Sequence, residues 1–200
     1  MNVGAPGRDS DGGVFSNCAL SSLLESRKLN IPDPKNLPNS ALSLPYVILA
    51  DDAFPLKEYI MKPYSARNLD IAQRVFNYRL SRARRIIENV FGILSSRFRV
   101  LRKRIEVLPS TAKKIVCAVC ALHNFLMYKA REMYAPVGSF DIEQEDGTYI
   151  GGTWRNENSR ENRSATNLSR NATQNAKYIR DEFKNYFNSV GSVPWQYNAI

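Results

Sequence analysis

The feature that most constrains the fold is one long amphipathic segment in the middle of the chain. Between Asn68 and Arg97, apolar residues recur with the 3.6-residue period of an α-helix over about seven turns. Gly92 interrupts this pattern and indicates a close approach or a bend. The apolar residues of the segment are Leu69, Ala72, Val75, Phe76, Leu80, Ala83, Ile86, Ile87, Val90, Phe91 and Leu94. Apolar residues make up 44% of the 200-residue chain, so we expect a packed core rather than wholesale disorder.

A short apolar run precedes the long helix. Residues 46–50 (YVILA) are continuously apolar and rich in strand-forming residues, a pattern typical of a buried central strand. The run ends abruptly at Asp51 and Asp52. Four prolines between Ile31 and Pro45 predict a loop before it.

Shorter helices are expected on both sides of these elements. Phe15–Leu29 is predicted to be helical, and a second helix is expected from a Ser110 cap to Met127. Thr173–Phe187 is amphipathic and predicts the last helix. From 141 to 170 the composition shifts to Asn, Ser, Glu, Gly and Arg, which indicates flexibility. We therefore expect an α/β domain over residues 1–128, a flexible segment over 129–170, and a C-terminal helix and tail over 171–200.

Positive charge is concentrated in one stretch. The chain has a net charge of +9, and residues 74–104 alone carry ten basic side chains against one acid, Glu88. The basic residues are Arg74, Arg79, Arg82, Arg84, Arg85, Arg97, Arg99, Arg102, Lys103 and Arg104. Such a surface favours a polyanionic partner, most often nucleic acid, and Arg suits phosphate recognition. The alternative is a basic helix that is simply solvated.

The remaining composition indicates an intracellular protein. The three cysteines are too few for a disulfide framework, and the first residues lack the basic and apolar regions of a secretory signal. No apolar run is long enough for a transmembrane helix, so no membrane partner is expected. The sequons at Asn162, Asn167 and Asn171 would then stay unglycosylated.

Two carboxylates are the first candidates for chemistry. Asp51 follows the predicted strand, at the sheet edge where sites of α/β proteins gather. Glu88 is flanked by apolar residues, so it should lie near the buried side of the helix, where an acid needs a partner or a metal. Strand-end and helix carboxylates can bind Mg²⁺, which prefers oxygen ligands. The alternative is a turn aspartate and an ordinary ion pair of Glu88 with Arg84 or Arg85.

Two other patterns are interpreted as structural. Cys117, Cys120 and His123 lie on one helical stripe and are zinc-ligand types, but a fourth ligand is lacking, and such residues in an apolar helix are usually core. Phe76 and Phe91 are expected on the core face of the long helix, which argues against base stacking.

Four ordered blocks resemble a known family, the Harbinger-type (PIF/Harbinger) DDE transposases and their domesticated nuclease relatives. Residues 50–56 (ADDAFPL), followed by 61–64 (MKPY), resemble the family's Gly-Asp-x-x-[Phe/Tyr]-Pro-Leu block. Residues 77–84 (NYRLSRAR), continuing into 87–94 (IENVFGIL) and 97–99 (RFR), resemble the next block. Residues 122–126 (LHNFL) and the opening segment 3–15 are similar to two more, with a looser likeness at 179–181 and 195–196.

The resemblance implies an RNase H-like α/β fold whose acidic triad binds two divalent ions, Mg²⁺ or Mn²⁺, and cuts DNA. Asp51 matches the second acid and Glu88 the third. Asp11 matches an acid of the opening segment; we assign it to shaping the loop, with metal binding as a secondary role. In the family the first acid, its strand and an N-terminal DNA-binding region precede this opening segment, so we expect an N-terminally truncated domain with the first strand missing and part of its metal site absent.

The leading hypothesis is a metal-dependent DNA endonuclease domain of transposase origin, incomplete as written, whose ten basic residues hold the DNA backbone. The alternatives are a catalytically dead DNA- or protein-binding remnant and a helical protein whose basic helix meets an acidic partner. The oligomeric state and a separate DNA-binding partner protein stay open. The proposed substrate implies the nucleus, with the cytoplasm as the alternative location.

Overall fold

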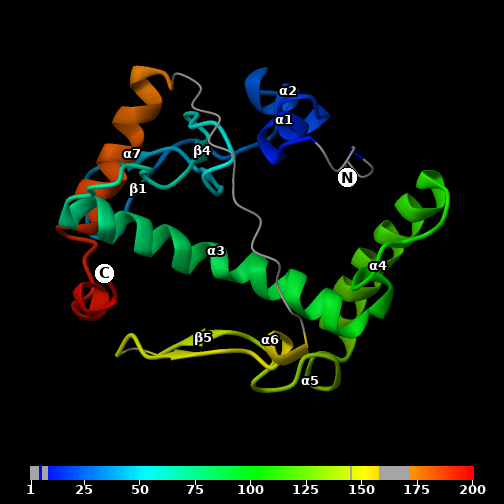
Figure 1. Cartoon of the computed structure of the whole chain (residues 1–200). Helices are drawn as coiled ribbons and strands as arrows, with labels where there is room; N and C mark the ends of the chain where they lie inside the picture. The colour runs from blue at the N-terminus through cyan, green and yellow to red at the C-terminus, as the bar shows by residue number, and fades with distance from the viewer. Residues whose placement is uncertain (1–4, 6–8, 145, 158–171) are drawn as a thin grey trace. The chain divides into compact units, whose positions relative to one another are not determined.

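The computed structural model describes residue 5 and residues 9–144, 146–157 and 172–200, which form a mainly helical α/β structure with small two-stranded sheets. The described residues divide into two compact units (Figure 1). One comprises residues 9–84 and 172–200 and is called the strand unit here. The other comprises residue 5 and residues 85–144 and 146–157 and is called the hairpin unit. The long helix α3 (Ile71–Arg97) begins in the first and ends in the second, and confirms the helix predicted over 68–97.

The strand unit combines short strands with helices. Its helices besides the first part of α3 are α1 (Asp11–Ser16), α2 (Ala19–Glu25), α7 (Gln174–Phe187) and the 3₁₀ helix η2 (Pro194–Ala199). Strands β1 (Lys35–Asn36) and β2 (Ser43–Leu44) pair antiparallel, whereas β3 (Ile48–Leu49) and β4 (Ile60–Met61) pair parallel.

The first helical segment is two helices rather than the one predicted over 15–29. The Ser10 side chain accepts a hydrogen bond from Gly13 N at 3.2 Å and caps α1, which ends at Ser16. Cys18 then caps α2, its Sγ accepting from Ser21 N at 3.5 Å. A second N-cap eight residues after the first restarts the helix and explains the break.

The predicted strand exists, but the prediction that it is buried and central is wrong. Ile48 pairs with Ile60 and Leu49 with Met61, in a sheet of two strands. Ile60 and Met61 are each 1% exposed, whereas Ile48 is 41% and Leu49 38% exposed. Apolar composition identified a strand, but burial depends on neighbours that short sequence runs do not reveal.

The core of the strand unit joins α3, α7 and β4. Leu56, Met61, Phe76, Leu80, Ala176 and Ile179 form one buried cluster. Thr173 caps α7 by accepting from Ala176 N at 3.2 Å, so this predicted helix is confirmed. The Tyr64 hydroxyl donates to Asp181 Oδ1 at 2.5 Å. Burial and this carboxylate raise the pKa of Tyr64, so the phenol stays protonated and fastens α7 to the segment after β4.

The hairpin unit includes the second part of α3. It contains the 3₁₀ helix η1 (Arg99–Leu101), α4 (Pro109–Lys129), α5 (Arg131–Tyr134), the antiparallel strands β5 (Ile142–Glu143) and β6 (Tyr149–Ile150), and α6 (Trp154–Glu157). Ile93, Tyr134, Ala135 and Trp154 form its buried cluster. The helix expected after a Ser110 cap begins two residues earlier, at Pro109 with Leu108 as N-cap, so the predicted serine cap is wrong. Among the described residues, no helix has the length and apolar character to cross a membrane.

Buried hydrogen bonds fasten the hairpin and α6 to α3. Asn89 Oδ1 accepts from Asp141 N at 2.8 Å and from Trp154 Nε1 at 3.0 Å, and Asn89 Nδ2 donates to Asp141 O at 3.2 Å. A Cβ on Gly92 would collide with the Trp154 ring, which confirms the close approach predicted there. Helices and strands do not report motion, so the flexibility of residues 129–170 stays a prediction. The sequons at Asn162, Asn167 and Asn171 lie outside the described residues.

An ion pair closes the same hairpin. Arg155 donates from Nε and Nη2 to the two carboxylate oxygens of Asp141 at 2.8 and 2.6 Å, and Gly152 N donates at 2.8 Å. Burial opposes ionisation of this carboxyl, but the hydrogen bonds from Arg155 and Gly152 prevail and lower the pKa of Asp141. The charged pair therefore persists at neutral pH.

Candidate functional site

Asp51 lies in the turn directly after β3, at the carboxyl end of the parallel pair, as predicted. Its Oδ1 accepts a hydrogen bond from Ala53 N at 3.0 Å, which fixes the turn. Its Oδ2 lies 3.7 Å from Arg84 Nη2. The Asp51 side chain is 41% exposed, so its carboxylate can still reach a ligand from solvent.

Lys62 accompanies Asp51 at this strand end, and sequence reasoning gave it no role. Lys62 follows β4, and its Nζ lies 2.9 Å from Asp52 Oδ1 and donates to Asp52 O at 2.7 Å. The ammonium thereby ties the ends of β3 and β4 together beside Asp51. Its position directly after a strand was the signal that could have identified it.

Helix α1 packs against the turn that carries Asp51. A Cβ on Gly12 would collide with the carbonyl oxygen of Ala53, so only glycine permits this approach. Phe15 and Phe54 support it with an edge-on ring contact at 5.7 Å between centroids. Asp11, the exposed first residue of α1, is thereby placed on the element beside the Asp51 turn. Its charge also favours the positive end of the helix dipole, which supports a role in shaping this segment.

Glu88 lies on α3 in the hairpin unit and is half-buried. The two arginines that could neutralise it are engaged elsewhere. Arg84 faces Asp51, and Arg85 Nη1 donates to Glu143 Oε2 at 2.6 Å. Among the described residues, the Glu88 side chain takes part in no hydrogen bond or ion pair, so the alternative of an ordinary ion pair with Arg84 or Arg85 is wrong.

The two carboxylates have the chemistry that a divalent metal requires. Mg²⁺ and Mn²⁺ prefer oxygen ligands, and Asp51 and Glu88 each offer a carboxylate; Arg84 lies 3.7 Å from Asp51 Oδ2, whereas no described residue pairs with the Glu88 carboxylate. In the part of the chain that is described, no three or more His, Cys, Asp or Glu side chains lie together so that they could hold a metal ion. Asp51 and Glu88 belong to different units, so a shared site stays a prediction.

The ten basic residues of 74–104 fall into two sets. Four of them are partly buried and contact other side chains or the backbone of the chain. Arg79 Nη1 donates to Gly191 O at 3.1 Å and Gln196 Oε1 at 3.2 Å, and burial lowers its pKa. Arg82 lies over the Trp195 ring at 5.4 Å, and Arg84 and Arg85 form the ion pairs given above. The exposed set is Arg74, Arg97, Arg99, Arg102, Lys103 and Arg104. The predicted DNA contacts of all ten stay predictions, and the exposed set is the better placed to make them.

In the stripe of Cys117, Cys120 and His123, the histidine has a structural role. His123 is buried, and its Nδ1 lies 2.9 Å from the Tyr134 hydroxyl, which joins α4 to α5. Burial lowers the pKa of His123, so the ring is neutral at pH 7. The prediction for Phe91 is wrong, because Phe91 is 64% exposed while Phe76 is 1% exposed. The helical period identified one stripe but not how much of it is covered.

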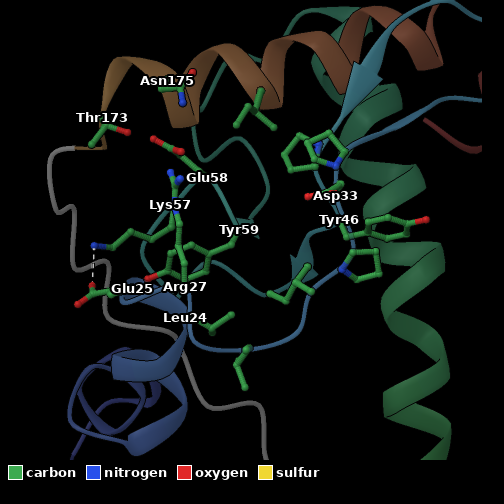
Figure 2. Close-up of a pocket in the computed structure, with 16 residues that line it drawn as sticks. Leu24, Glu25, Arg27, Asp33, Tyr46, Lys57, Glu58, Tyr59, Thr173 and Asn175 are labelled. Carbon is green, nitrogen blue, oxygen red and sulfur yellow. Dashed lines mark hydrogen bonds and ion pairs between the residues drawn. The ribbon is translucent and has the colours of Figure 1, made fainter.

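A cavity of about 800 Å³ lies elsewhere in the strand unit (Figure 2). Residues of α2, the proline-rich loop, the segment before β4 and the start of α7 line it. Figure 2 shows Lys57 reaching Glu25, an ion pair of 3.1 Å. Burial and the Glu25 carboxylate raise the pKa of Tyr59 nearby. None of the predicted site residues lines this cavity.

Comparisons with known proteins identify relatives of the chain. Residues 1–124 match the family described as DDE superfamily endonuclease. An Arabidopsis thaliana protein described as Protein ALP1-like is 28% identical over 129 residues, which cover 62% of this chain and 31% of that protein. The chain thus spans about a third of the length of that relative. No solved structure matches the chain.

Proposed function

The chain belongs to the DDE superfamily endonuclease family, and on this premise we propose that it supplies two acids of a divalent-metal-dependent DNA endonuclease. The Harbinger-type resemblance is confirmed at the level of the family. The finer proposal is an RNase H-like domain in which Asp51 and Glu88 hold Mg²⁺ or Mn²⁺ and a phosphodiester of DNA is hydrolysed, in a nucleus. Because the chain spans about a third of its relative, the activity of the whole protein is part of this proposal.

The observation that carries the proposal is the state of Glu88. A half-buried helical carboxylate with arginines three and four residues before it would normally take one of them as its partner. Here Arg84 lies 3.7 Å from Asp51 and Arg85 lies 2.6 Å from Glu143. The carboxylate is thereby kept available on a strongly basic helix, an arrangement that suits a metal ligand better than a structural acid.

The protein's contribution to cleavage is positioning. When bound, two divalent ions supply an activated water nucleophile and stabilisation of the leaving oxygen. Asp51 is held by Ala53 N and by the close approach of Gly12 to Ala53, so its carboxylate direction is fixed before a ligand arrives. Lys62 and Arg84 place positive charge beside Asp51, where they can attract the phosphate backbone or stabilise charge that develops on it. Asp51 and Glu88 make up only part of a three-acid site, and Asp11 remains a secondary candidate ligand.

Plasmid cleavage tests the proposal. We expect nicking of supercoiled plasmid, with Mg²⁺ or Mn²⁺ and not with EDTA, from a protein in which a third acid completes the site of Asp51 and Glu88. Asp51→Asn and Glu88→Gln should each reduce the rate at least about a hundredfold, since each removes a ligand charge. Glu132→Gln, at an exposed acid on α5, is the matched control and should cleave as the unmodified protein does.

The second candidate function is a DNA-binding remnant without catalysis, which the exposed basic side chains favour. Glu88→Gln separates the two. A nuclease loses cleavage and metal dependence, whereas a binding remnant keeps its DNA affinity or gains slightly, because a negative charge leaves a basic surface. Equal behaviour of the unmodified protein and Glu88→Gln in both assays would support the remnant and overturn the nuclease.

A further inference from the structure

The link between α3 and α4 carries a high density of positive charge. Residues 97–114, called the basic connector here, run from the end of α3 through η1 into the first turns of α4. They contain seven basic side chains and one acid, Glu106. The basic residues are Arg97, Arg99, Arg102, Lys103, Arg104, Lys113 and Lys114.

Most of these cations have no structural use. Five of the seven are exposed and make no hydrogen bond or ion pair with any other described residue, namely Arg99, Lys103, Arg104, Lys113 and Lys114. Glu106 is exposed and likewise has no ion-pair partner among the residues described. Like charges that are concentrated in one short link repel one another. A bound polyanion would relieve that repulsion.

The backbone of the basic connector is held in place. Arg102 Nε donates to Ser95 O at 2.8 Å and Arg102 Nη2 to Ser96 O at 2.7 Å, so one guanidinium closes the carboxyl end of α3. This interaction uses a cation where the helix dipole favours one. Pro109 then begins α4. A surface ordered in advance loses less entropy when it binds.

Two arginines of α3, Arg79 and Arg85, differ in this respect. Arg79 is tied to Gly191 and Gln196, and Arg85 is tied to Glu143. Turning either toward a phosphate would break contacts that hold its unit together. These two arginines of α3 are therefore less free to contact a phosphate than the exposed cations of the basic connector.

We propose that the basic connector is the surface of this chain that binds the backbone of duplex DNA, independently of base sequence. This inference rests on the proposed function for the choice of DNA as the polyanion. The exposed cations of the basic connector contact phosphates, whereas Arg79 and Arg85 maintain the fold. Binding there needs neither a metal nor Glu88.

Fluorescence anisotropy with a labelled duplex of about 30 base pairs, in EDTA and over a series of KCl concentrations, tests the proposal. The test variant is R99Q/K103Q/R104Q/K113Q/K114Q. Each lost phosphate contact lowers the slope of log K against log [salt] by about 0.9. We expect the slope to fall by more than about 2, and Kd at moderate salt to rise at least about tenfold.

The matched control is K28Q/K35Q/R67Q/K129Q/K177Q, which removes the same number of exposed cations from other segments. It should keep the slope of the unmodified protein within about 1. Equal losses in the two variants would overturn the proposal, since net charge alone would then explain binding. Arg85→Gln should lower stability and leave the slope unchanged.

The outcomes separate this proposal from the proposed function. If the unmodified protein binds duplex DNA and the test variant binds equally well, the basic connector is excluded while the nuclease proposal stands. If the unmodified protein does not bind duplex DNA in EDTA, both the partner and this surface are wrong. Displacement of the duplex by polyglutamate as effectively as by unlabelled duplex, at equal charge, would identify an acidic protein partner instead.

Discussion

Asn89 is predicted to be the residue on which the hairpin unit depends most. Its side chain is buried, accepts from Asp141 N and Trp154 Nε1, and donates to Asp141 O. Asn89→Ala removes all three hydrogen bonds at once. It leaves two N–H donors and one carbonyl without their partner inside the unit.

The expected loss follows from those groups. A buried donor left without a partner costs about 1–3 kcal/mol. Two such donors give roughly 2–6 kcal/mol, and water entering the vacated space reduces the cost toward the lower end of that range. We expect Asn89→Ala to lower the free energy of unfolding of the hairpin unit by about 2 kcal/mol or more.

Tryptophan fluorescence during urea unfolding measures this loss. The chain has two tryptophans, so in a Trp195→Phe background the signal comes from Trp154, which is buried against Gly92. Phe91→Ala, on an exposed neighbour of the same helix, is the control and should change stability by less than about 1 kcal/mol. A loss below about 1 kcal/mol for Asn89→Ala would refute the reasoning.

Three further predictions concern the same unit. Gly92→Ala forces a methyl group into the Trp154 ring and should cost about 1–3 kcal/mol in the same assay; an unchanged transition would contradict the packing. Arg155→Met leaves the fully buried Asp141 carboxylate without its cation and should cost about 3 kcal/mol, the lower end for a buried pair because Arg155 is 35% exposed; Lys103→Met is the exposed control. His123 is the single histidine, and burial lowers its pKa, so the unfolded chain takes up this proton first. The contribution of neutral His123 to stability is complete above about pH 6.5 and is lost as pH falls below that value. Between pH 7 and 5.5 the unmodified protein should therefore lose more stability than His123→Gln does.

Local patterns predicted the elements whose cause is local. The 3.6-residue period identified α3, the amphipathic pattern of residues 173–187 identified α7, and the end of the apolar run placed Asp51 after a strand. Gly92 was correctly interpreted as a close approach. The helices and the strand end depend on residues close in sequence, whereas the partner that Gly92 approaches, Trp154, is distant.

Long-range contacts set the rest. Asn89 read as an ordinary helix residue, and its partners Asp141 and Trp154 are 52 and 65 positions away. Arg79 was counted as a DNA contact, yet it reaches Gly191, 112 positions later. Phe91 fits the apolar stripe but lies on a part of it that the described residues leave exposed. Periodicity fixes which face a residue occupies, whereas its coverage depends on which distant segment packs there.

The sequence left two roles open for Glu88, an intrahelical ion pair and a metal ligand, and the observed contacts exclude the first. Its flanking arginines made an intrahelical ion pair the simple expectation, and the partners of Arg84 and Arg85 exclude that pair. The metal role of Glu88 is the central claim of the proposed function.

Titration with Mn²⁺, followed by the loss of the free-ion signal in electron paramagnetic resonance, tests this claim most directly. We predict that the unmodified protein and Glu132→Gln bind Mn²⁺, whereas Asp51→Asn and Glu88→Gln each bind at least about tenfold more weakly, because each loses a carboxylate ligand. An identical titration of Glu88→Gln and the unmodified protein would contradict it.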